Sequence, residues 1–138
     1  MEYNAVIVRL FLALLCGAVV GLERELHDKA AGLRTHILVC LGACLFGILG
    51  QSLTSHHTEA DILRVAQGIL IGVGFLGAGV IFKEGDTIRG LTTAAGMWVI
   101  GAVGLAIGTG NYYLGIVGTL FVFITLSIVG RVERWKKK

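Results

Sequence analysis

Five apolar runs, each long enough to cross a lipid bilayer as a helix, constrain this chain more than any other feature. A spanning helix needs about 20 mostly apolar residues. The nine Asp and Glu residues all lie outside the five runs. The sequence therefore predicts an all-α integral membrane protein with about five transmembrane helices in one domain, 1–138. The predicted spans are Ala5–Leu22, His36–Leu53, Ile62–Phe82, Leu91–Gly108 and Tyr112–Gly130.

The composition excludes several other classes of protein. Only 15% of the residues are charged, whereas soluble domains average about 25%. The basic residues flank apolar runs instead of covering one soluble face, so we expect no nucleic-acid partner. Cys16, Cys40 and Cys44 lie inside apolar runs, which favours packing over disulfides or a shared metal.

The distribution of basic residues predicts the orientation in the membrane. Of the 12 Lys and Arg residues, ten lie in Glu23–Thr35, in Lys83–Gly90 or after Gly130. With five spans all ten fall on one side, which the positive-inside rule assigns to the cytoplasm. We therefore expect the N-terminus outside and the C-terminus in the cytoplasm.

The other two basic residues, Arg9 and Arg64, lie inside the predicted spans near their outer ends. Each side chain either reaches to the outer headgroups or meets a buried polar partner. Gln67 follows Arg64 by three positions on the same helix face, which favours a polar surface shared by those two residues.

Glycines at four-residue spacing predict close packing between helices. We expect this packing within one protomer more than at a dimer seam, with the third span at the centre. The first span also resembles the third, and the second resembles the fourth, which suggests a parallel repeat of two spans each. The packing glycines are Gly17, Gly21, Gly68, Gly72, Gly74, Gly77 and Gly79, with Gly104 and Gly108 in the fourth span.

Two segments concentrate polar residues at the predicted cytoplasmic ends of the helices. They read GLERELHDKAAGLRTH (21–36) and GVGFLGAGVIFKEGDTIRGLTTAAGMW (72–98). Their threonines could cap helix N-termini or bind an anion there, and the charges could instead form a clamp of ion pairs between the loops. The candidate functional cluster is Glu23, Arg24, Arg34, Thr35, Arg89, Thr92 and Thr93.

These segments resemble the signature of the MgtC/SapB family. The resemblance rests on GLER, AGLRTH, GFLGAGVI and IRGLTTAAGMW and covers about residues 5–130. It implies a multi-pass protein of the bacterial plasma membrane that acts in magnesium homeostasis; some members are associated with virulence. Larger members continue into a soluble C-terminal domain, whereas this sequence stops at a basic segment.

Two functions remain open at this stage. The first is transport of Mg²⁺ as a substrate, although Mg²⁺ prefers carboxylate and water ligands and no span contains an acid. An outer loop with His56, His57, Glu59 and Asp61 could gather a cation. The second is a non-transporting regulator that binds another membrane protein. We expect a small homo-oligomer such as a dimer, no cofactor and no enzymatic activity, and the metal ligands stay unassigned.

Overall fold

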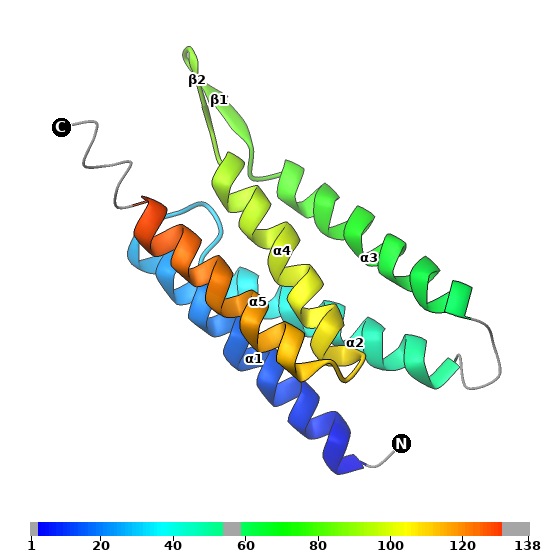
Figure 1. Cartoon of the computed structure of the whole chain (residues 1–138). Coiled ribbons are helices and arrows are strands. Elements are labelled where there is room, and N and C mark those ends of the chain that lie inside the picture. Colours follow the sequence, from blue (N-terminus) through cyan, green and yellow to red (C-terminus); the bar gives the residue numbers. More distant parts are fainter. Residues whose placement is uncertain (1–2, 54–58, 131–138) are drawn as a thin grey trace.

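The computed structural model describes residues 3–53 and 59–130, and within them the chain is a bundle of five helices (Figure 1). Among the described residues, four helices are long and apolar enough to cross a membrane, and the stretch Leu63–Ala78 of α3 is apolar as well. The predicted all-α membrane fold is confirmed. The helices are α1 (Tyr3–Leu26), α2 (Leu33–Leu53), α3 (Glu59–Ala78), α4 (Leu91–Gly108) and α5 (Tyr112–Ile124), and a π-helical segment Thr125–Val129 continues α5.

A short β-hairpin, which the sequence analysis did not predict, joins α3 to α4. Strand β1 (Phe82–Glu84) pairs antiparallel with β2 (Thr87–Arg89). Gly85 has φ 59°, and a positive φ at the first loop position is the pattern of a type II′ turn. The third predicted span therefore ends too late at Phe82, because α3 stops at Ala78.

The bundle has two ends, the hairpin end and the opposite end. The hairpin end contains the C-terminal ends of α1 and α3 and the starts of α2 and α4. The opposite end contains the start of α1, the end of α2 and the α4–α5 turn. In that turn Gly110 has φ 85°, and Asn111 Oδ1 accepts a hydrogen bond from Leu114 N at 3.2 Å.

The central helix is α4, which corrects the expectation that the third span would be central. Helix α4 contacts all four other helices and runs through the middle of the bundle, whereas α3 lies at one side (Figure 1). In α4, 56% of the positions are buried, against 17% in α5 and its continuation. The buried core gathers around α4 residues such as Met97, Ile100 and Ile107.

Glycines of α1 and α4 set close helix approaches to α2. A Cβ at Gly17 or Gly21 of α1 would lie 2.8 Å from the Cα of Ile37 or Leu33. A Cβ at Gly104 or Gly108 of α4 would overlap the carbonyl oxygen of Cys40 or Cys44 of α2.

The glycines of α3 do not form such a seam. A Cβ at Gly68, Gly72 or Gly74 would have no atom within 4 Å, and one at Gly77 would make ordinary contact with Ala94. A Cβ at Gly79 would lie nearest to Leu76 O of its own helix, at 3.2 Å. Spacing alone cannot reveal which helix face meets another backbone, so the packing expected for Gly68, Gly72 and Gly74 is absent within the described chain.

Candidate functional site

A buried ion pair lies at the hairpin end, where α1 continues past its predicted limit. Glu23 and Arg24 are 5% and 4% exposed. Arg24 donates from Nε and Nη2 to Glu23 Oε2, each at 2.5 Å. Removing two charges from water is costly unless they pair well. This pair therefore places a neutralised acid and base inside the bundle.

His36, in the first turn of α2, is fully buried beside this pair and was not among the predicted site residues. Its Nδ1 lies 2.9 Å from Gly32 O. Because a carbonyl oxygen can only accept, Nδ1 carries the hydrogen, and Nε2 of the neutral ring is an acceptor. Nε2 is buried without a hydrogen-bond partner in the described chain. It lies on the side of α4, where a Cβ at Gly96 would be 3.8 Å from it.

Glu23 Oε1 is a second buried polar atom without a hydrogen bond in the described part of the chain. His27 Nδ1 lies 3.3 Å from it. The same nitrogen is closer to the Glu23 backbone oxygen, at 2.8 Å, and one ring hydrogen cannot serve both oxygens well. Two buried acceptors, Glu23 Oε1 and His36 Nε2, therefore have no hydrogen bond within the described chain, which is uncommon for buried polar groups.

Small residues position these side chains. A Cβ at Gly21 would lie 3.1 Å from His36 Cβ, so the bare surface of α1 admits the histidine. Thr93, in the first turn of α4, is 3% exposed. Glu23, Arg24, His36 and Thr93 are the buried polar side chains of the hairpin end, and we call them the buried polar group.

The predicted cluster divides into two environments. Glu23, Arg24 and Thr93 are buried, whereas Arg34 and Thr92 are exposed and Thr35 is half-buried. Arg89 pairs with Glu84 across the hairpin at 2.7 Å, and both side chains are more than 60% exposed. The structure does not bring all seven residues together.

The expected threonine caps are also absent. Helix α4 begins after Gly90, at φ 90°, without a side-chain cap. At the start of α2, Glu25 Oε2 accepts a hydrogen bond from Leu33 N at 2.9 Å. The cap therefore comes from the neighbouring helix, which no local sequence pattern could indicate.

A second polar network ties the opposite end of the bundle around Arg9. Arg9 Nη1 donates to Gln51 Oε1 at 2.6 Å and to Gly108 O at 2.7 Å. Gln51 Nε2 donates to Thr109 O at 2.9 Å. A cation at the C-terminal carbonyls of α4 is favoured by the helix dipole. Arg9 therefore has polar partners, but its contact with Gln51 is exposed and not buried.

Arg64 and Gln67 are exposed on α3, and the glutamine that meets an intramembrane arginine is Gln51. No group of three or more metal-ligating side chains gathers within the described residues. His56 and His57 lie outside the described residues, and the side chains of Glu59 and Asp61 are not described.

Apolar side chains fill the space between the two polar networks. Ala13 and Val20 of α1, Cys40 and Cys44 of α2, and Ile100 of α4 are each 0% exposed.

The sequence signal for the missed His36 was its place at the end of AGLRTH, one turn after Gly32 at the start of α2.

Comparison with known proteins gives a consistent family match. The MgtC family profile matches residues 10–135. The Escherichia coli K12 protein named "Putative magnesium transporter YhiD" is 42% identical over 88% of this chain and 59% of its own length. Bacillus subtilis SapB is 38% identical over 94% of this chain and 58% of its own. Brucella abortus MgtC is 46% identical over 85% of this chain and 48% of its own length.

The chain thus spans about half to three fifths of the length of these three relatives. No solved structure matches it.

Proposed function

The chain belongs to the MgtC family of membrane proteins, and from this premise we propose that it acts in magnesium homeostasis as a non-conducting regulator. In this role it is a multi-pass protein of the bacterial plasma membrane without enzymatic activity. It binds another membrane protein, and the buried polar group sets the shape of the surface that it presents.

The packed apolar core between the two polar networks carries this proposal. Mg²⁺ retains its water shell and takes oxygen ligands, so a path for it must be wide and polar. In one protomer the route from Arg9 to Glu23 passes side chains that are 0% exposed, such as Ala13, Val20 and Ile100. The carboxylate of Glu23 is already neutralised by Arg24.

A second candidate function is transport of Mg²⁺ by assembled copies. The name of the Escherichia coli relative favours it, and so does the free acceptor Glu23 Oε1. A pore between protomers would not need a path through the core of one protomer.

Mg²⁺ flux into proteoliposomes that contain only the purified protein separates the two candidates. If the protein is a regulator, the Mg²⁺ flux should equal that of protein-free liposomes. Circular dichroism confirms that the protein is folded. Flux above that background that Glu23→Gln removes would overturn the regulator proposal and support transport.

Growth at limiting Mg²⁺, in a bacterial host without its own family member, tests the role of the buried polar group. We expect the double variant Glu23→Gln with Arg24→Gln, which leaves no charge unpaired, and His36→Leu to lose complementation although they insert at normal levels. Glu84→Gln, which changes an exposed acid of the hairpin, is the matched control and should grow like the unaltered protein. Equal growth of all three variants would remove the buried polar group from the functional site.

A further inference from the structure

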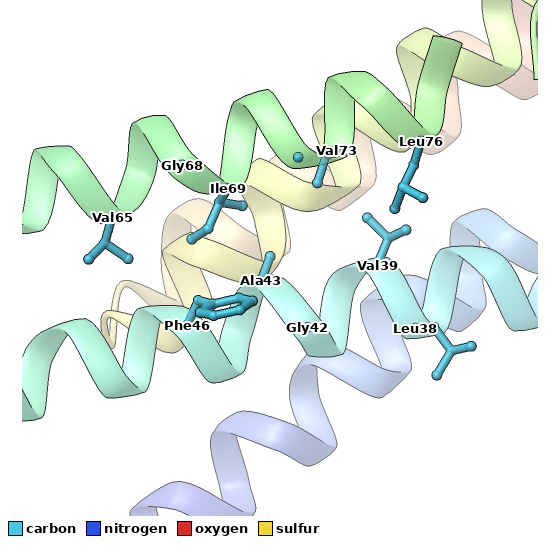
Figure 2. Close-up of a pocket in the computed structure, with 11 residues that line it drawn as sticks. Leu38, Val39, Gly42, Ala43, Phe46, Val65, Gly68, Ile69, Val73 and Leu76 are labelled. Carbon is cyan, nitrogen blue, oxygen red and sulfur yellow. The ribbon is translucent and has the colours of Figure 1, made fainter. Parts of the chain in front are cut away.

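An apolar groove of about 610 Å³ runs between α2 and α3, outside the site described above. Figure 2 shows the residues of both helices along it. Val39, Ala43, Ile69 and Val73 form its buried floor. Leu38, Phe46 and Leu76 are more than half exposed and form its rims. The groove therefore opens sideways, towards the membrane.

The groove exists because α2 and α3 touch at one end and separate along the rest of their length. A Cβ at Gly50 would meet Val65 at 3.4 Å. Farther along, a Cβ at Gly42, Gly68 or Gly72 would have nothing within 4 Å. The described chain leaves this space unfilled, and its lining offers no side chain able to hydrogen-bond.

The groove suits a hydrocarbon chain. A helix rises about 1.5 Å per residue, so the groove spans about 16 Å from Val65 to Leu76. Its lining is apolar throughout, and lipid acyl chains are the apolar groups that surround a membrane helix on its open side.

A basic residue lies one helical turn beyond the residues of α2 that line the groove. Leu38, Gly42 and Phe46 line it at four-residue spacing along α2. Arg34 is one further turn along the same stripe, towards the hairpin end, and its side chain is exposed. An exposed arginine beside an apolar channel is suited to a phosphate whose attached chain lies in that channel.

We propose that the groove between α2 and α3 binds an anionic phospholipid, with one acyl chain on the floor and the phosphate at Arg34. This proposal concerns a lipid site on the side of the bundle. It does not depend on whether the protein regulates or transports.

Lipid retention by the full chain, measured by native mass spectrometry, tests the site. The probes are phosphatidylglycerol and phosphatidylethanolamine with identical acyl chains. Gly42→Leu and Gly68→Leu add a side chain at lining positions where a Cβ would have no atom within 4 Å. Each should lower retention of both lipids about tenfold, the loss of contact for roughly two methylene groups. Gly74→Leu is the matched control, because Gly74 is as open but does not line the groove.

The headgroup contact is tested separately with Arg34→Gln. This change should reduce the preference for phosphatidylglycerol about fivefold and leave phosphatidylethanolamine retention unchanged. Lys29→Gln, another exposed cation near the start of α2, should change neither lipid. Unchanged lipid retention in Gly42→Leu and Gly68→Leu would overturn the proposal. A loss of dimers without a loss of lipid in those variants would also overturn it and make a second copy the occupant.

Discussion

The same kind of ion pair occurs in two different environments in this protein. Glu23 and Arg24 are buried inside the bundle, whereas Glu84 and Arg89 are exposed on the hairpin. Breaking a buried pair leaves an uncompensated charge inside the protein, while water screens the partner that remains at the surface. The stability of the fold should therefore depend strongly on the first pair and weakly on the second.

This difference gives a prediction at the residue scale. Arg24→Gln should lower the free energy of unfolding by about 3–5 kcal/mol, and Arg89→Gln should lower it by no more than about 1 kcal/mol. Unfolding in mixed detergent micelles, followed by circular dichroism, measures both. The double variant Glu23→Gln with Arg24→Gln should recover part of the loss, since no charge is then left unpaired. Equal losses for the two arginine variants would show that the buried pair has no special role.

At the scale of the elements, the position of a glycine matters more than its spacing. Gly104 and Gly108 lie where the backbone of α2 passes closest, whereas Gly68, Gly72 and Gly74 face open space. All of them occur in similar apolar, glycine-rich runs. Helices approach closely in membranes where small residues meet the neighbouring backbone, and that holds at α4 but not at most of α3.

Alanine substitutions should therefore have opposite effects in these two helices. Gly104→Ala places a methyl group against Cys40 O and should destabilise the protein by about 1–3 kcal/mol. Gly74→Ala meets nothing and should stabilise it slightly, by up to about 1 kcal/mol, because alanine favours the helix. Thermal unfolding of the two variants in the same detergent compares them. A loss of stability in Gly74→Ala would mean that another chain packs there.

At the scale of the whole molecule, the segments that connect the helices lie at the two ends of the bundle. The hairpin and the α1–α2 connection lie at one end, and the start of α1 lies at the other (Figure 1). The positive-inside rule places the hairpin end in the cytoplasm. This orientation remains a prediction from the distribution of charge.

Cysteine labelling in cells checks this orientation. We expect Asp86→Cys, in the exposed hairpin loop, to react with a membrane-impermeant maleimide in inside-out vesicles and not in spheroplasts. Asn4→Cys, exposed near the start of α1, should show the reverse pattern. The native cysteines are at most 6% exposed, so their background should be low. Labelling of Asp86→Cys from the outer side would invert the predicted topology.

The sequence by itself determined the solvent, the class of fold and the family. A hydrophobic run of spanning length can be read directly from the sequence. All five predicted spans therefore match helices of the structure with boundaries within about four residues, when the π-helical segment is counted with α5. Glu23, Arg24 and Thr93 were singled out from the sequence because polar residues beside apolar runs stand out, and the structure buries all three.

Tertiary structure alone decided which faces meet. The choice of α4 as the central helix, the burial of His36, the cap that Glu25 gives to α2 and the Arg9–Gln51 contact all join residues of different helices. Periodicity places a residue on a face of its own helix, but it carries no information about the backbone that passes opposite. That information exists once the helices have packed.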